Sequence, residues 1–114
     1  MKKKFSYAWQ GIATGLKHKS IRIQFILAAM AMLAGIIMRL KPMEWAAVII
    51  CIGAVITAEM LNTCIEKICD FITKDYREEI KVIKDIAAGA VLVTSLAALI
   101  TALIILACHL GMLS

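Results

Sequence analysis

The chain has 114 residues, of which 62% are hydrophobic and 18% charged, and its mean hydropathy is +0.89. This composition excludes a water-soluble domain of this size and indicates an integral membrane protein. The net charge of +5 comes with no nucleic-acid-binding fold, so anionic lipid headgroups are a better match for the basic residues than nucleic acid is.

The N-terminal segment, from about residue 5 to residue 20, is predicted to form an amphipathic helix on the membrane surface. Its apolar residues Phe5, Trp9, Ile12 and Leu16 recur at helical spacing, and polar residues occupy other positions on the wheel. Such a helix could act only as an anchor, or it could contribute side chains to a site.

Three apolar segments follow, at about residues 23–38, 45–66 and 86–110. About 20 residues cross the hydrocarbon core of a bilayer, so the second segment spans it only if the helix continues through Glu59. Basic residues are concentrated before the first span and between the second and third spans. The positive-inside rule therefore places the N-terminus and this connection in the cytoplasm. We expect one all-α membrane domain, residues 1–114, in the plasma membrane.

The end of the second span carries five polar side chains at helical spacing. Glu59, Asn62, Thr63, Glu66 and Asp70 fall within an arc of about 100° on one helix face. A carboxylate at membrane depth costs roughly 2.5–3.5 kcal/mol even on lenient insertion scales, and such residues usually mark function. A polar network that only specifies subunit assembly is the simpler alternative, but five polar groups on one face favour a site.

The connection between the second and third spans is rich in mixed charges, and most of it is expected to be a solvated linker. Lys84 and Asp85 differ because they stand where the third span begins and face the carboxylates of the second helix. Small residues follow them, which favours close helix packing. Because three thin helices cannot enclose a pocket alone, we expect a homo-oligomeric bundle with sites between subunits.

The chemistry that this polar face could support is phosphoryl transfer, which depends on positioning and charge neutralisation. Glu66 could hold Mg²⁺, which binds through one or two carboxylates and substrate phosphates. Glu59 is partly desolvated and could accept a proton from a hydroxyl delivered by the bilayer, and Asn62 could orient either carboxylate. No Walker A or protein-kinase signature is present, so any nucleotide site differs from those of soluble kinases.

The positive charge of Lys84 could neutralise phosphate in the same reaction. Asp70 or Asp85 could orient Lys84 or act as a second metal ligand. These two possibilities remain open from the residues alone.

The chain resembles a known family in residues 58–70 (AEMLNTCIEKICD), in residues 84–92 (KDIAAGAVL) and more weakly in residues 7–12 (YAWQGI). This family comprises the small integral-membrane prokaryotic diacylglycerol kinases and the related undecaprenol kinases. The resemblance implies a homotrimer with sites shared between neighbouring subunits. It also implies transfer of the γ-phosphoryl group of Mg·ATP to a lipid alcohol at the cytoplasmic face of a bacterial membrane. The segments LNTCIE and AAGAVL look closer to the undecaprenol kinase branch of the family. The resemblance therefore favours undecaprenol over diacylglycerol as the lipid acceptor.

The resemblance also implies roles for individual residues. Glu59 resembles the proton acceptor, Asn62 its close neighbour, and Glu66 a ligand of the metal and the nucleotide. Asp70 would support the site as a catalytic-site residue. Further nucleotide contacts are implied for Tyr7, Asp75, Tyr76, Arg77, Lys84 and Asp85. The family usually has a His where Arg77 stands.

One departure from the family concerns the end of the surface helix. The family has a metal-binding Glu there, whereas residues 17–20 read KHKS and contain no acid. Either His18 substitutes for it, or the metal relies on Glu66 and phosphate oxygens. Two rival functions remain: a small homo-oligomeric transporter that uses Glu59 as its embedded carboxylate, and a structural or holin-like subunit, which would leave the polar face unexplained.

Overall fold

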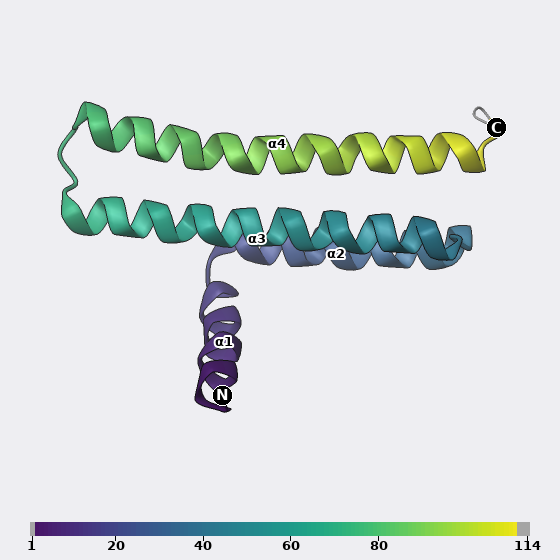
Figure 1. The fold of residues 1–114 in the computed structure, drawn as a ribbon, viewed down its shortest axis with the longest axis horizontal. Helices are drawn as coiled ribbons and strands as arrows, with labels where there is room; N and C mark the ends of the chain where they lie inside the picture. The colour runs from purple at the N-terminus through teal and green to yellow at the C-terminus, as the bar shows by residue number, and fades with distance from the viewer. Residues whose placement is uncertain (1, 112–114) are drawn as a thin grey trace.

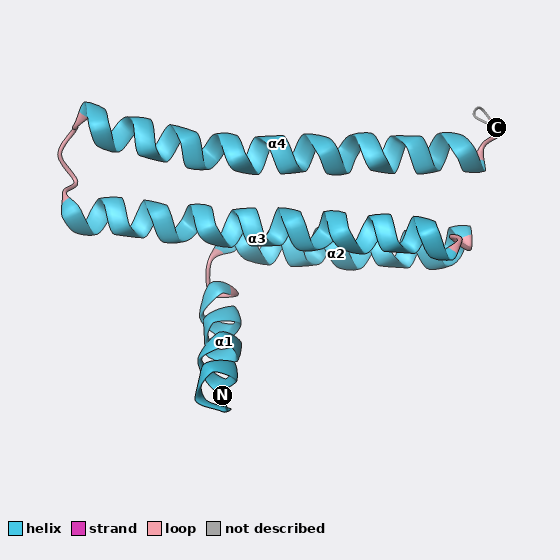
Figure 2. Ribbon diagram, in the orientation of Figure 1, coloured by secondary structure: helices cyan, strands magenta, loops and turns pink. Residues whose placement is uncertain are grey.

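The computed structural model describes residues 2–111, which form four helices and no strand. The helices are α1 (Lys2–Gly15), α2 (Lys19–Met38), α3 (Pro42–Ile72) and α4 (Glu78–His109) (Figures 1 and 2). The last three are each long and apolar enough to cross a membrane. The predicted class, an all-α membrane protein with an N-terminal helix and three long apolar helices, is therefore confirmed.

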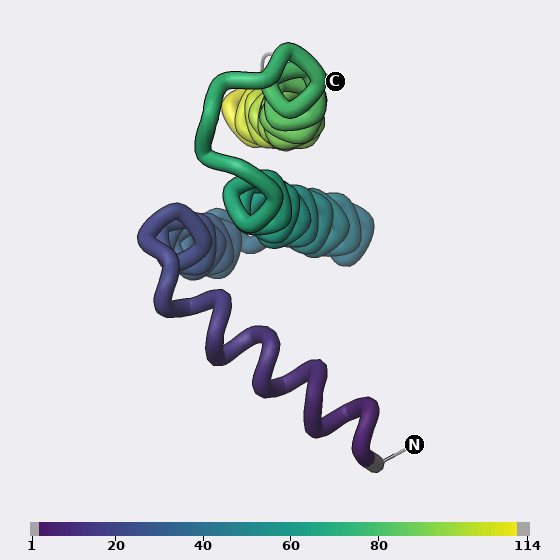
Figure 3. The backbone as a smooth tube through the Cα atoms, turned by 90° about the vertical axis from the view of Figure 1, so that its left-hand side faces the viewer, coloured from purple at the N-terminus to yellow at the C-terminus, as the bar shows by residue number. Residues whose placement is uncertain are grey.

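Helix α3 is the central element of the bundle. It packs against both α2 and α4, which lie on different sides of it in the end-on view of Figure 3. At 1.5 Å per residue, the 31 residues of α3 measure roughly 46 Å, well beyond the roughly 30 Å of a hydrocarbon core. One end of α3 and the adjoining end of α4 therefore extend past the apolar region, and the polar residues of interest lie there.

The turn between α2 and α3 is tight and locally determined. Arg39 ends α2 in the left-handed conformation, with φ of 56°, and the N–H of Leu40 donates to the carbonyl of Gly35. Pro42 begins α3, where its fixed φ suits the first turn. The N–H of Lys41 donates to Oε1 of Glu44 at 2.9 Å and caps the helix.

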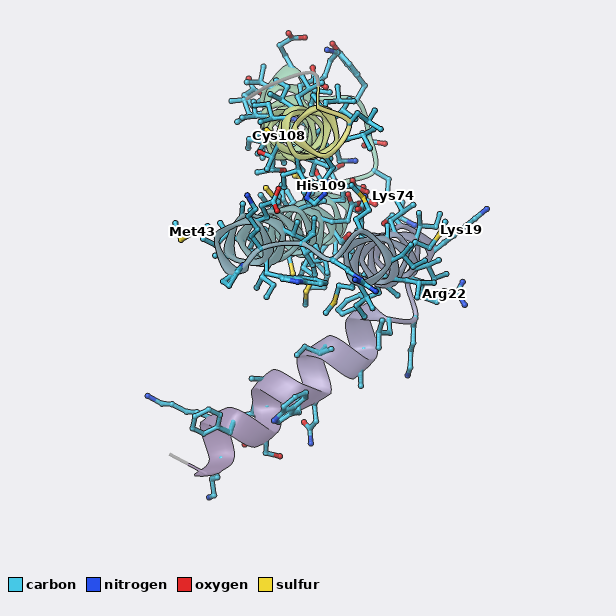
Figure 4. All side chains as sticks on the ribbon, turned by 90° about the vertical axis from the view of Figure 1, so that its right-hand side faces the viewer. Lys19, Arg22, Met43, Lys74, Cys108 and His109 are labelled. Carbon is cyan, nitrogen blue, oxygen red and sulfur yellow. The ribbon has the colours of Figure 1, made fainter. Side chains whose placement is uncertain are left out.

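At the same end of the bundle, a side-chain contact connects the start of α3 to the end of α4. Nε2 of His109 lies 3.0 Å and 3.1 Å from the two carboxylate oxygens of Glu44. Figure 4 shows His109 between the two helices, whereas Lys19 and Arg22 extend from α2 away from α4. This contact fixes the register of α4 on α3 at the end of the bundle far from the polar face of α3.

Gly35 allows α2 and α3 to approach each other beside their turn. A Cβ atom at this position would lie 2.8 Å from Cη2 of Trp45 and 3.0 Å from Cδ1 of Leu40. Gly35→Ala is therefore expected to destabilise the fold by about 1–3 kcal/mol, the usual range for overpacking. A thermal melt in detergent measures this effect. The matched control is Gly11→Ala, where a Cβ would meet nothing within 4 Å; an equal loss in both variants would contradict the steric explanation.

Helix α1 points away from the three long helices (Figures 1 and 3). It ends at Gly15, whereas the surface helix was expected to continue to about residue 20; residues from Lys19 onward belong to α2. In the turn, the N–H groups of Lys17 and His18 donate to the carbonyls of Thr14 and Gly15. Side-chain atoms of Ile21 and Met60 lie 3.5 Å and 3.6 Å from the position of a Cβ atom at Gly15. Trp9 and other apolar side chains of α1 remain exposed within the described chain, as expected of a helix that lies on a membrane surface.

Candidate active site

The polar face of α3 contains two side chains that are buried in spite of their polarity. Glu59 is 8% exposed and Asn62 is 9% exposed. Thr63 donates from Oγ1 to the backbone carbonyl of Glu59 at 3.0 Å, which holds its hydroxyl against the helix. Glu66 and Asp70 continue the face toward the end of α3 and are exposed. The face therefore passes from a buried carboxylate to exposed ones over about three turns of helix.

The amide of Asn62 has a defined orientation. Its Nδ2 donates to Oε1 of Glu66 at 2.7 Å. Because an ionised carboxylate only accepts hydrogen bonds, this contact assigns the nitrogen to Glu66 and leaves Oδ1 on the other side. Oδ1 is buried and has no hydrogen-bond partner among the described residues. Buried acceptors without a donor are rare, so this atom calls for a donor from outside the single chain.

The carboxylate of Glu59 is in a similar position. Residues 2–111 supply it with no hydrogen bond or ion pair, and only its backbone carbonyl accepts one. The carboxylate oxygens of Glu59 can only accept hydrogen bonds when ionised, so they remain available to the hydroxyl of a substrate. That property suits a general base.

The exposed end of the face is tied to α4 by charge. Nζ of Lys84 on α4 lies 2.8 Å from Oδ1 of Asp70 on α3. Within α4 itself, Nζ of Lys81 lies 2.6 Å from Oδ2 of Asp85. The side chains of Lys84 and Asp70 are 38% and 52% exposed, so their pair contributes only roughly 0.2–1 kcal/mol to stability. Lys84 can therefore exchange Asp70 for another anion at little cost.

A hollow of about 330 Å³ adjoins this pair at the α3–α4 connection. Its lining consists of Lys74, Asp75, Tyr76, Arg77, Ile80, Lys81, Lys84 and Asp85. Four of these side chains are cationic, which suits an anionic ligand. The hydroxyl of Tyr76 donates to Oε2 of Glu78 at 2.6 Å, and this bond raises the pKa of Tyr76. The N–H of Asp75 donates to Oγ1 of Thr73 at 3.0 Å, which shapes the loop.

The structure thus brings most of the sequence-predicted site residues to one end of the bundle. The exception is Tyr7, which is 66% exposed and belongs to α1, the helix that projects away from the three long helices (Figure 1). His18 occupies the N-cap position of α2, where its side chain makes no capping hydrogen bond.

Glu66 is the carboxylate on this face that could best hold a metal ion. Its Oε1 accepts from Asn62, while Oε2 has no hydrogen bond within the described residues. No group of three or more His, Cys, Asp or Glu side chains that could hold a metal occurs in that part of the chain. A single carboxylate still fits Mg²⁺, because this ion is usually held by one or two carboxylates together with substrate phosphates and waters.

One polar residue near the site was missed by the sequence reasoning. Gln24 lies in the expected first span, and in the structure it lines a groove on the same side of α3 as Glu59. The signal that could have found it is an amide inside an apolar segment, which is expensive without a partner.

The fold and the site together define a small helical membrane protein with a buried carboxylate and a cationic hollow at the same end of its bundle. The family profile described as prokaryotic diacylglycerol kinase matches residues 6–106. This chain belongs to the prokaryotic diacylglycerol kinase family, and the resemblance seen in the sequence is confirmed. With its three apolar helices, it is a bacterial membrane protein.

Two curated relatives bear names consistent with this family. The chain is 33% identical over 104 residues to the undecaprenol kinase of Bacillus subtilis, covering 90% of this chain and 85% of that protein. It is 32% identical over 98 residues to the diacylglycerol kinase of a Synechocystis species, covering 84% of this chain and 56% of that protein.

Proposed function

We propose that this protein is a lipid kinase that transfers the γ-phosphoryl group of ATP to the hydroxyl of a membrane lipid alcohol. The observation that carries this proposal is the buried Glu59 carboxylate, which lacks a donor and shares one helix face with Glu66. The cationic hollow at the same end of the bundle supports it, since ATP is a polyanion. The names of the relatives agree with a lipid alcohol as acceptor.

In this reaction Glu59 accepts the proton of the lipid hydroxyl. The hydroxyl oxygen forms a bond to the γ-phosphorus, the bond from that phosphorus to the bridging oxygen breaks, and ADP leaves. Asp70 supports the site through its ion pair with Lys84.

Glu66 would hold Mg²⁺ together with phosphate oxygens of the nucleotide. The ion would neutralise charge on the transferring phosphoryl group. Asn62 keeps the Glu66 carboxylate in place through its 2.7 Å hydrogen bond, so the ligand is oriented before the ion binds.

The nucleotide is expected in the hollow at the α3–α4 connection. Lys84 and Arg77 would contact its phosphates, and Asp75, Tyr76 and Asp85 would complete the lining. Tyr7 would reach a nucleotide only from a neighbouring subunit, which fits a homotrimer with shared sites. The hollow and the N-terminus would face the cytoplasm of the bacterial plasma membrane, where ATP is present.

Undecaprenol is favoured over diacylglycerol as the acceptor. The chain covers 85% of the undecaprenol kinase that it matches, but 56% of the diacylglycerol kinase. The deciding experiment is incubation of the detergent-solubilised oligomer with labelled ATP, Mg²⁺ and either lipid. Label in undecaprenol alone, or in greater amount, supports the proposal. Label in neither lipid, together with a flux that depends on a proton gradient, would favour the transporter.

Lys84→Met is expected to raise KM for ATP about tenfold or more, because a charge-assisted contact with phosphate contributes about 1.5–3 kcal/mol. The KM for the lipid should stay the same, and steady-state kinetics with each substrate varied in turn measures both. Lys67→Met is the matched control, because Lys67 lies on α3 at the same end of the bundle as Lys84 but outside the hollow. An equal rise in both variants would point to a general loss of positive charge rather than to a contact from Lys84.

A further inference from the structure

Two polar side-chain contacts connect α3 to α4, one near each end of the helix pair. Lys84 pairs with Asp70 at the end that carries the candidate site. At the opposite end, Nε2 of His109 lies 3.0 Å and 3.1 Å from the two carboxylate oxygens of Glu44 (Figure 4). Within residues 2–111, no other side-chain hydrogen bond or ion pair joins these two helices.

The contact between Glu44 and His109 is the more shielded of the two. The side chains of His109 and Glu44 are 24% and 18% exposed, less than those of Lys84 and Asp70. Water and salt weaken the attraction between exposed charges much more than that between partly buried ones. A change in charge at Glu44 or His109 should therefore alter stability more than one at the exposed pair.

The positions of the two residues on their helices favour their charged forms. Glu44 is in the first turn of α3, and its Oε1 also accepts the backbone N–H of Lys41 at 2.9 Å. His109 is in the last turn of α4. Negative charge is stabilised at the start of a helix and positive charge at its end. Both helix termini thus reinforce an ion pair between a carboxylate and an imidazolium.

Only this contact changes its charge near neutral pH. Lysine and aspartate side chains ordinarily keep their charges between about pH 5 and pH 8, whereas an imidazole ordinarily gains a proton near about pH 6.5. A neutral imidazole can still donate one hydrogen bond to a carboxylate, but it adds no positive charge. The stabilisation from the ion pair is therefore present in mildly acidic solution and is lost as the pH rises through the titration of the imidazole.

Few other groups at this end compete with that titration. Arg39 and Lys41 are exposed cations in the turn between α2 and α3, and the remaining charged residues of α2 lie in its first turn, at the other end. Residues 23–58 and 86–111 contain no acid besides Glu44. The charged or titratable residues of the described chain at this end are Arg39, Lys41, Glu44, Cys108 and His109.

We propose that Glu44 and His109 form a pH-sensitive clamp on the bundle. In mildly acidic surroundings the ion pair holds the end of α4 on the start of α3, and this hold weakens as the pH rises. The clamp does not depend on the proposed function. Because the cationic hollow is at the opposite end of the bundle, the clamp would respond to the pH on the side of the membrane away from the nucleotide.

The first test is a set of thermal melts in detergent at about pH 5.5 and about pH 8, without nucleotide or metal. His109→Gln should lower the melting temperature by about 4 °C at the acidic pH and by clearly less at the alkaline one. His109→Lys carries a positive charge at both values, so it should abolish the difference between them. Adding Glu44→Gln to His109→Gln should cause little further loss, because the pair is already broken.

His18→Gln is the matched control, since His18 is the other of the two histidines and its side chain makes no capping hydrogen bond. This variant should keep the wild-type dependence on pH. An equal loss at both pH values in His109→Gln, or additive losses in the double variant, would overturn the proposal.

A second measurement needs no variant and therefore holds even where a substitution prevents folding. Hydrogen exchange of the wild-type protein, corrected for the intrinsic effect of pH, reports the local stability of each helix end. Protection of the last turn of α4 should fall several-fold between the two pH values, while that of the first turn, beside the exposed ion pairs, should stay the same. Unchanged protection of the last turn would show that no such clamp exists.

Discussion

Glu59→Gln is expected to lower kcat for lipid phosphorylation by about 10²–10⁴-fold, the usual contribution of a general base. The amide retains the size of the side chain but cannot take the proton of the lipid hydroxyl. Because the Glu59 carboxylate is buried and has no donor in the described chain, its replacement by a neutral amide should not lower the melting temperature. Labelled-ATP assays and thermal melts of the same preparation measure the two effects.

The melt separates catalysis from assembly. If Glu59 belonged to a polar network between subunits, Glu59→Gln would weaken the oligomer, and the loss of activity would follow from dissociation. The control is Glu44→Gln, which neutralises another partly buried carboxylate of α3 at the opposite end of the bundle, beside His109. That variant should retain the wild-type kcat. Full activity in Glu59→Gln would remove this residue as the base.

The helical architecture could be predicted from the sequence because it follows from local patterns. Long apolar runs define the three long helices, and the 100° step between residues predicts that Glu59, Asn62 and Glu66 share one face. The continuation of α3 to Ile72 follows from the same face, since its polar residues keep helical spacing beyond the apolar run.

The remaining features depend on how the helices pack, and periodicity along the chain carries no information about that. Asp70 and Lys84 are 14 residues apart, and they pair only because α3 and α4 fold back on each other. The orientation of the Asn62 amide depends on which nearby group accepts from it. Helix α1 ends at Gly15, beside Ile21 and Met60, whereas the amphipathic spacing of apolar residues continues to Leu16 and gives no sign of this end.

The position of helix α1 also explains why Tyr7 does not lie beside the other residues of the candidate site. Tyr7 lies on a helix that points away from its own bundle, and its neighbours Phe5 and Trp9 are 65% and 70% exposed. An exposed amphipathic helix needs a membrane surface or another subunit to cover its apolar side. A site completed by a neighbouring subunit would therefore be incomplete in any single chain.

Glu66→Gln is expected to raise the Mg²⁺ concentration for half-maximal activity by at least about tenfold. Loss of a residue that only supports a ligand typically costs 10–100-fold in metal affinity, and Glu66 would itself be the ligand. The amide oxygen can still accept the hydrogen bond from Asn62, so the local geometry should remain while the negative charge is lost. A Mg²⁺ titration at saturating ATP and lipid measures the shift.

Two comparisons make this titration decisive. Glu79→Gln removes an exposed acid from the first turn of α4, outside the hollow, and should leave the titration unchanged. Glu59→Gln should lower the maximal rate without moving the Mg²⁺ midpoint, because its role is with the proton. If Glu66→Gln had the wild-type midpoint, the metal would have to be held without this carboxylate. His18 and the nucleotide phosphates would then be the ligands to test, since residues 17–20 contain no acid.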